Sequence, residues 1–543
     1  MTTVAIVGSG ISGLSTAVSL AEKGIRSVVL SPFPSERSQS VMAAGGINAV
    51  DEHDPLDSIE AHIEDTLSGG RYLAGYDAVK GLCSAAPGII AQLERAGTVF
   101  TRNAQGGIDR RAFGGQRYKR TCYSGTATGK QIVSALVMAC RRYEALGLIE
   151  RRQWSDFHSA LIKDGHCYGI LVFDESTREL YPLYADAVVM AAGGQNALFG
   201  KTTGSTVCDG YAAGRLFMQG ADLKNLEFIQ YHPTTLETPQ KKMLVSEAAR
   251  GEGGRLFYEK DGRRIYFMEE RYGDKGNLMP RDVISREMAG ISEQVYLDVS
   301  FLGKDIIEHR LPEVQELCRK YRGIDITEEP IPVTPSVHFF MGGLAVDLNH
   351  ETNIRELFAV GECASIYHGA NRLGGNSLLA ALYSGHTAAE AIAGRSYTGT
   401  HPDLTAYVSS EQEKLSQSFA SESRFPVMYI RDLLAEHMQK QLGIVREKET
   451  LLDGIRDIEF YLDSVDRIHY DSSVLAYFNY SLKGLLVLAK ATLLCAEARR
   501  ESRGAHNRSD YPEEDPQMNC ATIISYEDGA YRIHYDREGR YEH

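Results

Sequence analysis

The feature that most constrains the fold is a glycine-rich turn near the N-terminus. Gly8, Gly10 and Gly13 fall between an apolar run, Val4–Val7, and an amphipathic stretch, Leu14–Lys23. The apolar run is typical of a buried strand, and the stretch after the turn is typical of a helix. In this context a G-x-G-x-x-G turn lets backbone N–H groups and the helix N-terminus meet a pyrophosphate. The chain is therefore predicted to open with a dinucleotide-binding βαβ unit.

The next strand and a second glycine cluster bear on which dinucleotide is bound. Ser27–Leu30 is the predicted second strand, and Ser31 stands at its end, where NAD-binding units carry an acid for the ribose hydroxyls. This departure weakens an NAD interpretation more than it weakens the fold. Gly45 and Gly46 follow, where a flavin needs close approach of the backbone to its ring. Glycines that serve turns alone remain the alternative for this cluster.

The pattern of apolar, charged and glycine residues divides the rest of the chain into segments. Two further segments, Ala187–Gly194 and Leu357–Glu362, are typical of buried strands that run into glycine turns, so one nucleotide domain is expected from discontinuous pieces. Mixed short elements separate them, long amphipathic helices follow, and the chain ends in tyrosine-rich alternation that could pair as strands. The expected domains are 1–222 with 336–398 for the nucleotide, 223–335 for an inserted cap, 399–505 for a helical domain and 506–543 for a tail.

Charge and cysteine usage argue against several classes of function. The net charge of −14 argues against nucleic acid as the main partner and repels small dianions at long range. A dianionic substrate would therefore need a local cluster of arginine and histidine. The nine cysteines stand singly, without C-x-x-C pairs or metal-ligand spacing, so no iron–sulfur cluster or structural metal is expected. Without a targeting pattern or an apolar run of roughly 18 residues, a cytoplasmic chain with no membrane span is expected.

Nine sequence blocks carry a family resemblance. They are Gly8–Gly13, Ser38–Gly46, Gln230–Thr234, Ser246–Gly254, Pro280–Asp282, His338–Gly343, Gly361–Cys363, His368–Gly374 and Glu501–His506. In this order, and over nearly the whole chain, the sequence resembles the flavoprotein subunits of succinate dehydrogenases and fumarate reductases. The resemblance implies an α/β fold, in which a Rossmann-like FAD-binding domain carries an inserted α+β capping domain and is followed by a C-terminal helical domain.

The resemblance implies FAD as the cofactor. The implied cofactor-binding residues are Gly8, Gly10, Gly13, Ser31, Gln39, Ser40, Gly45, Gly46, Gly193, Gly194, Asp209, Glu362, Asn376, Ser377 and Leu378. In the best-known members, a histidine bonded covalently to the flavin stands where this chain has Gln39. An amide cannot be alkylated by the flavin methyl group, so FAD is expected without a covalent link there. Loss of that electron-withdrawing bond should lower the flavin potential, which favours fumarate reduction over succinate oxidation.

The resemblance also implies where a substrate binds. His232, Ser246, His338 and Arg372, with Phe113 beside them, are implied to hold the two carboxylates of fumarate or succinate. These residues would supply the local positive cluster that the net charge demands. Arg372 suits a bidentate contact with a carboxylate, which a lysine could not reproduce.

A proton-transfer group is implied next to the substrate. In the family, hydride passes between flavin N5 and one substrate carbon while an arginine delivers a proton to the neighbouring carbon, and by position that arginine is Arg281. Glu247 and Arg250, which lie one turn apart if the stretch is helical, are implied to reprotonate it; an ordinary helix ion pair is the alternative for this pair. Because guanidinium ordinarily keeps its proton, such an acid requires neighbouring positive charge, from Arg250 and Arg372, and a dry site.

Two other functions stay open at this point. L-aspartate oxidase shares Ser246–Ala248 and Arg250–Glu252, but that family places a glutamate, which accepts the substrate ammonium, where this chain has Phe113. A flavoprotein that binds FAD for an interaction role without turnover is the second alternative. Since the chain offers no iron–sulfur ligands, the resemblance implies an iron–sulfur subunit and a quinone-reactive or other electron-donor subunit as partners, through which the protein would associate with a membrane.

Overall fold

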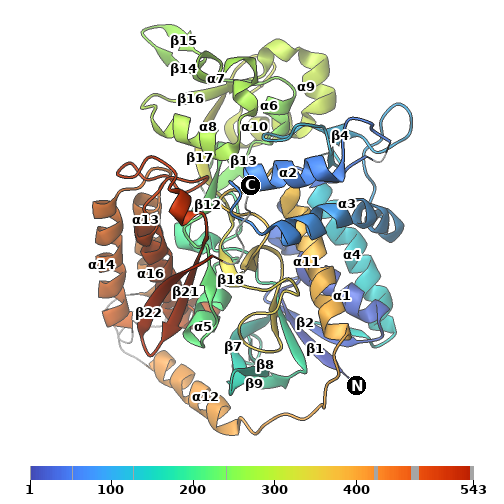
Figure 1. The fold of residues 1–543 in the computed structure, drawn as a ribbon, viewed down its shortest axis with the longest axis vertical. Coiled ribbons are helices and arrows are strands. Elements are labelled where there is room, and N and C mark those ends of the chain that lie inside the picture. The colour runs from blue at the N-terminus through green and yellow to red at the C-terminus, as the bar shows by residue number, and fades with distance from the viewer. Residues whose placement is uncertain are drawn as a thin grey trace.

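The computed structural model describes residues 2–51, 53–125, 127–239, 241–420, 426–465 and 476–537. A five-stranded parallel sheet, in the order β19-β10-β1-β2-β6, organises the lower part of the molecule (Figure 1). Its strands are β1 (Thr3–Val7), β2 (Arg26–Ser31), β6 (Ile149–Gln153), β10 (Ala187–Met190) and β19 (Leu357–Ala359). The strands of one sheet therefore come from widely separated parts of the chain, as the glycine turns predicted.

Strand β1 sends alternate side chains to the two faces of this sheet. Val4 and Ile6 pack against helices on one face, and Ala5 and Val7 pack against an antiparallel meander and α5 on the other. The helices on the first face are α1 (Ile11–Glu22), α3 (Tyr76–Ala96), α4 (Thr128–Ala145) and α11 (Asn376–Ala393); the second face carries β7 (Ser155–Lys163), β8 (His166–Asp174), β9 (Glu179–Tyr184) and α5 (Tyr211–Met218). Both faces are covered, as a parallel sheet requires.

A capping segment forms the upper part of the molecule (Figure 1). Its antiparallel sheet has the order β13-β12-β17-β16-β14-β15. The strands are β12 (Ile229–Glu237), β13 (Lys242–Leu244), β14 (Arg255–Lys260), β15 (Arg263–Ile265), β16 (Val295–Asp298) and β17 (Ile331–Phe340); the helices are α6 (Ala248–Gly251), α7 (Phe267–Tyr272), α8 (Arg281–Ala289), α9 (Lys304–Arg310) and α10 (Pro312–Arg322). The long paired strands β12 and β17 lead into and out of this segment, so residues at their ends lie at its base.

The C-terminal part combines helices with two strands. The helices are α12 (Thr405–Ala420), α13 (Val427–Gln441), α14 (Lys448–Ser464), α15 (Ala476–Tyr480) and α16 (Leu482–Ala498). The tyrosine-rich alternation forms a hairpin, β21 (Ala521–Glu527) and β22 (Ala530–Asp536), which joins β11 (Leu223–Lys224), β18 (Gly343–Ala345) and β20 (Ala364–Ser365) in one sheet. Residues 506–537 of the expected tail are therefore built into the molecule, and 538–543 lie outside the described residues.

Shorter elements complete the described part of the chain. They are α2 (Ile59–Gly69) and the small antiparallel sheet of β3 (Ile47–Asn48), β4 (Arg110–Arg111) and β5 (Thr121–Cys122). Within the described ranges, no helix combines the length and the apolar character that crossing a membrane requires. The same ranges contain no cluster of three or more His, Cys, Asp or Glu side chains that could hold a metal ion.

Candidate active site

A cavity of about 500 Å³ extends from the glycine turn after β1 to the base of the capping segment. Of the predicted cofactor residues, its lining includes Gly8, Gly10, Ser31, Gln39, Ser40, Gly45, Gly46, Gly193, Asp209, Glu362, Ser377 and Leu378. Of the predicted substrate and catalytic residues, it includes Phe113, His232, Ser246, Glu247, Arg281, His338 and Arg372. The fold thus brings most of the residues predicted from separate motifs to one continuous cavity.

Some predicted residues stand behind this lining. They are Gly13, Gly194, Arg250 and Asn376. The Asn376 side chain belongs to a buried network, in which its Oδ1 accepts from Asn48 Nδ2 at 2.7 Å and its Nδ2 donates to Thr66 Oγ1 at 2.9 Å. Gly13 allows α1 to pack closely on the turn, because a Cβ there would lie 2.0 Å from the Gly8 carbonyl oxygen. The roles of these two residues in the structure are therefore supporting ones.

The glycine turn after β1 fits a pyrophosphate. Gly8 has φ +110°, and a Cβ on it would lie 2.2 Å from the Ala191 carbonyl oxygen, so no other residue fits. Gly10 is the N-cap of α1 and offers no side chain to cap the helix. The Ile11 N–H donates to Ser40 Oγ at 3.1 Å, which holds the block Ser38–Gly46 against the N-terminus of α1. The backbone at this end of the cavity is arranged as an anion site requires.

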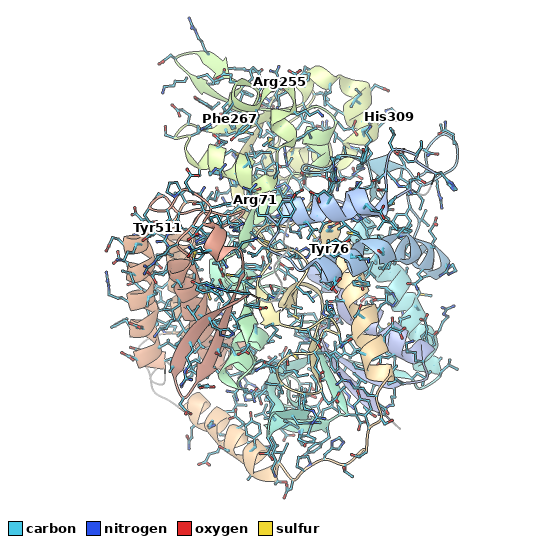
Figure 2. All side chains as sticks on the ribbon, viewed as in Figure 1. Arg71, Tyr76, Arg255, Phe267, His309 and Tyr511 are labelled. Atoms are coloured by element: carbon cyan, nitrogen blue, oxygen red, sulfur yellow. The ribbon has the colours of Figure 1, made fainter. Side chains whose placement is uncertain are left out.

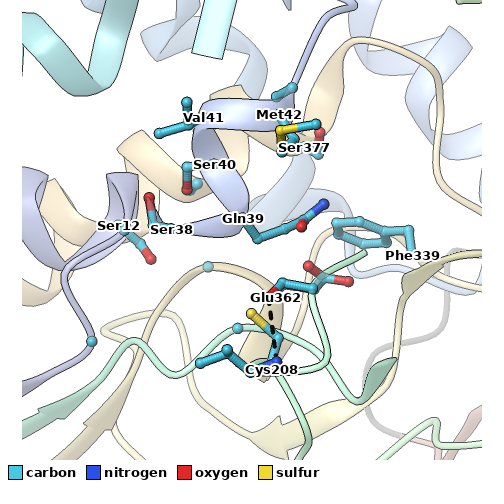
Figure 3. Close-up of a pocket in the computed structure, with 18 of the residues that line it drawn as sticks. Ser12, Ser38, Gln39, Ser40, Val41, Met42, Cys208, Phe339, Glu362 and Ser377 are labelled. Atoms are coloured by element: carbon cyan, nitrogen blue, oxygen red, sulfur yellow. Dashed lines mark hydrogen bonds between the residues drawn. The ribbon is translucent and has the colours of Figure 1, made fainter. Parts of the chain in front are cut away.

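Gln39 opens the short turn η2 (Gln39–Met42), and its amide reaches across the cavity toward the ring of Phe339, with Glu362 nearby (Figure 3). The adjacent Ser38 Oγ is buried and has no hydrogen-bond partner among the residues that the structure describes. Gly46, with φ +137°, could not carry a side chain, because a Cβ would lie 2.5 Å from the Cys122 carbonyl oxygen. The small and hydrogen-bonding groups here fit a flavin ring.

Glu362 lies on the opposite wall of the cavity, in the turn that follows β19 (Figure 3). Burial raises the pKa of its carboxyl to about 7, although the Phe340 N–H, which donates to Oε1 at 3.1 Å, and the charge of Arg372 favour the ionised form. A Cβ at Gly194 would lie 2.6 Å from the same Oε1. The absence of a side chain at Gly194 therefore leaves room for the Glu362 carboxyl. Glu362 therefore titrates near neutral pH.

We expect Glu362→Gln to gain stability relative to the parent protein as the pH rises. Because burial raises the folded-state pKa to about 7 from an ordinary 4.5, protonated Glu362 stabilises the fold fully below about pH 4.5, and this contribution is lost as the pH rises through 7. Melting temperatures of the two FAD-free proteins at about pH 5 and pH 8.5 measure the effect. A difference in melting temperature that is the same at both pH values would contradict it.

Glu247 joins two arginines at the cap end of the cavity. Its Oε2 accepts from Arg281 Nε at 2.9 Å and from Arg281 Nη2 at 2.6 Å, while its Oε1 accepts from the Gly114 N–H at 3.0 Å and lies 3.4 Å from Arg250 Nη2. Burial opposes ionisation of Glu247, but the charges of Arg281 and Arg250 outweigh it and lower its pKa to about 2. The result is a continuous chain of charged groups, Arg250–Glu247–Arg281, of which Glu247 and Arg281 reach the cavity.

Gln230 is a residue to which the sequence assigned no role of its own. It is fully buried, and its Oε1 accepts from Arg281 Nη1 at 3.0 Å and from Arg372 Nη2 at 2.9 Å. Its Nε2 donates to Asn371 Oδ1 at 2.7 Å and to the Arg372 carbonyl oxygen at 2.8 Å. One amide thus bridges the two arginines that face the cavity. Its only signal in the sequence is its place beside His232 in the block Gln230–Thr234.

The two predicted histidines face each other, with ring centroids 5.1 Å apart. His338 Nδ1 is hydrogen bonded with Thr203 Oγ1 at 2.8 Å, and the Thr234 N–H donates to His232 Nδ1 at 3.3 Å. Burial, followed by the charge of Arg281, lowers the pKa of both histidines well below the ordinary value. The expectation that they add positive charge is therefore wrong: they are neutral hydrogen-bonding groups, and the positive charge of the site comes from arginine.

Ser246 and Phe113 complete the lining near Glu247. The Ser246 Oγ accepts from the Ala248 N–H at 3.3 Å at the start of α6. The Phe113 ring lies against two glycines, since a Cβ on Gly45 would be 3.1 Å from it and one on Gly374 would be 3.2 Å from it. At this position the cavity is therefore bounded by an aromatic ring, which cannot accept a hydrogen bond from an ammonium as a carboxylate would.

Two protein families match the chain. Residues 3–378 match the FAD binding domain family, and residues 431–540 match the family described as the fumarate reductase flavoprotein C-terminal domain. Together these two matches include every block of the predicted site. The residues between 378 and 431 lie outside both matches.

Relatives and solved structures agree with these matches over nearly the full length. The chain is 37% identical to the succinate dehydrogenase flavoprotein subunit of Bacillus subtilis, over 96% of this chain and 93% of that protein. It is 33% identical to the fumarate reductase flavoprotein subunit of Haemophilus influenzae, over 98% and 93%. A structure of Escherichia coli quinol fumarate reductase superposes with a TM-score of 0.91 at 31% identity, over 99% of this chain and 97% of that one.

Proposed function

Because the chain belongs to the family of succinate dehydrogenase and fumarate reductase flavoprotein subunits, FAD-dependent oxidoreductases, we propose that it interconverts fumarate and succinate at the cap end of the cavity. The observation that carries this proposal is the convergence of Arg281 and Arg372 on the same end of the cavity as His232 and His338. Two arginines can neutralise a small dianion locally, against the net charge of the chain. Neutral histidines add hydrogen bonds that orient it.

The residues of the site suggest how the reaction is divided among them. When bound, FAD supplies the hydride chemistry. Arg372 binds one substrate carboxylate, and its charge, with that of Arg281, stabilises negative charge that develops on the substrate carbon. Arg281 passes a proton to the neighbouring carbon. Glu247, in contact with Arg281 and Arg250, then returns a proton to Arg281 from the Arg250 side.

The capping segment, proposed as residues 223–335, closes this site against water. Asn371 Nδ2 donates to Asp282 Oδ1 at 2.8 Å, which joins the loop of Arg372 to the start of helix α8, where Arg281 lies. This contact is made only when the cap lies against the nucleotide-binding part. Closure would therefore align the proton donor with the substrate and exclude solvent at the same time.

We propose that FAD is held without a covalent bond and that the flavin potential favours fumarate reduction. Gln39 supports this, because its amide lines the cavity and has no nitrogen that the flavin methyl group can alkylate. Acid precipitation of the purified protein should leave all the flavin in the supernatant. Flavin that stays with the precipitate would show a covalent link, and reversible voltammetry with strong succinate oxidation would contradict the proposed direction.

The function itself is tested by reducing the bound flavin without oxygen and adding fumarate. Reoxidation of the flavin, with formation of succinate, is the expected result. L-aspartate offered to the oxidised protein should leave the flavin oxidised, because Phe113 provides no acceptor for an ammonium group. Reduction by aspartate would favour L-aspartate oxidase, and a flavin that responds to neither compound would favour a binding role without turnover.

Electrons must reach the flavin from elsewhere, and we propose an iron–sulfur subunit followed by a quinone-reactive or other donor subunit. The relatives support this, because they are named as subunits and one solved structure is a quinol fumarate reductase. The protein would then lie on the cytoplasmic side of a membrane, held there by its partners. Purification from the native host under mild detergent should recover an iron–sulfur protein in equal amount; a chain recovered alone would contradict this assembly.

A further inference from the structure

The block Glu501–His506 takes no part in the proposed reaction, yet it forms a tight loop against the substrate end of the site. The Arg503 N–H donates to the His506 carbonyl oxygen at 2.8 Å, and the His506 N–H donates to the Arg503 carbonyl oxygen at 3.0 Å. Gly504 and Ala505 form the tip of this loop. The tip touches Ala370, where the Ala505 N–H donates to the carbonyl oxygen at 2.9 Å.

No side chain fits at Gly504. It has φ +55°, and a Cβ on it would lie 2.6 Å from the Ala370 carbonyl oxygen and 2.9 Å from the Ala370 Cβ. Ala370 is held on its other side as well, because its N–H donates to the Gly70 carbonyl oxygen at 2.9 Å. A displacement of the loop tip must therefore move the backbone of Ala370, and Arg372 follows two residues later.

The loop is anchored by buried charges on the far side from the cavity. Arg503 forms a bidentate pair with Glu501, at 2.8 and 3.0 Å, and Arg499 donates to the same carboxylate at 2.8 Å. Arg446 Nη1 donates to His506 Nδ1 at 2.8 Å. These groups are at most 5% exposed, and none of them lines the cavity.

Arg503 also contacts the segment of Gly70 and Arg71, which holds the N–H of Ala370. Its Nη1 donates to the Arg71 carbonyl oxygen at 3.3 Å, one residue after Gly70. Arg71 lies near the middle of the molecule, just below the capping segment (Figure 2). The C-terminal block thus fixes both supports of Ala370.

We propose that the Arg503–His506 loop is a positioning element that sets the place of Arg372 and thereby the preference of the site for two carboxylates over one. The inference rests on the proposed function, in which Arg372 binds a substrate carboxylate. Gln230 transmits the same constraint, because its amide is hydrogen bonded to both Asn371 and the Arg372 carbonyl oxygen and cannot follow a shifted loop without losing contacts.

The test compares two glycines of positive φ in the C-terminal part of the chain. Gly504→Ala places a methyl group against Ala370, whereas Gly529→Ala, at φ +85° with open space around it, carries the same backbone strain without a neighbour. The measured quantity is the ratio of kcat/KM for fumarate to kcat/KM for monomethyl fumarate. We expect Gly504→Ala to lower this ratio by about tenfold, through a weakened charged hydrogen bond, and Gly529→Ala to leave it unchanged.

Two companion variants separate the possible failures. Arg372→Lys should lower the same ratio at least as far; if it does not, the proposed contact of Arg372 with a carboxylate is wrong. If Arg372→Lys lowers the ratio and Gly504→Ala does not, only the positioning role is overturned. Should Gly504→Ala fail to fold or to bind FAD, His506→Asn replaces it, because an amide keeps the acceptor for Arg446 but loosens the anchor. An unchanged ratio in that variant overturns the inference, since a general loss of stability would scale both substrates equally.

Discussion

Arg281→Lys is expected to lower fumarate turnover by about 10²–10⁴-fold, the usual contribution of a general acid, while FAD stays bound. The guanidinium makes three hydrogen bonds at once, with Nε and Nη2 on Glu247 and Nη1 on Gln230. A lysine ammonium is a single point of charge on a flexible stem and cannot span both acceptors from this position. It would keep charge in the site but lose the alignment of the proton with the substrate carbon.

The matched control is Arg286→Lys, an exposed arginine on the same helix, α8. This change should leave turnover and FAD content as in the parent. Flavin absorbance shows whether each variant is loaded, and the dissociation constant for malonate shows whether the dianion site is intact. Turnover of Arg281→Lys within a factor of about ten of the parent would remove Arg281 as the acid.

The nucleotide-binding part could be predicted from sequence because local rules decide it. The motif of Gly8 predicts a tight turn, because the glycine follows an apolar run and precedes an amphipathic stretch. The structure agrees, since Gly8 has a φ of +110° and leaves no room for a side chain. The same holds for the strand that ends in the turn of Glu362. A short apolar run followed by glycines has few other uses, so pattern and structure agree there.

The electrostatics of the substrate end could not be predicted in the same way. A histidine has the same letter whether it is charged or neutral, and only its burial beside Arg281 shows that His232 is neutral. The bridging role of Gln230 also depends on Arg372, which is far along the chain and meets it only in the folded protein. Long-range contacts of this kind leave no periodicity in the sequence.

Gln230→Glu should raise the KM for fumarate by about 10²-fold or more, because a buried carboxylate at this position would compete with the substrate for the charges of Arg281 and Arg372. The amide oxygen now receives hydrogen bonds from Arg281 and Arg372 without competing for their charge. A carboxylate in its place would bind both arginines as a substrate carboxylate does. It would also lose the two N–H donors to Asn371 Oδ1 and the Arg372 carbonyl oxygen. A carboxylate oxygen would then face these two buried acceptor oxygens without a hydrogen bond.

Gln230→Leu separates charge from geometry, because it removes all four hydrogen bonds without adding a charge. If the neutral amide matters mainly by leaving both arginines free for the substrate, the glutamate variant must bind malonate more weakly than the leucine variant. If instead the amide serves only to hold the two guanidinium groups in place, the two variants should be equally impaired. Equal and small effects, within about threefold of the parent, would mean that Arg281 and Arg372 are held by other contacts and that the bridge is dispensable.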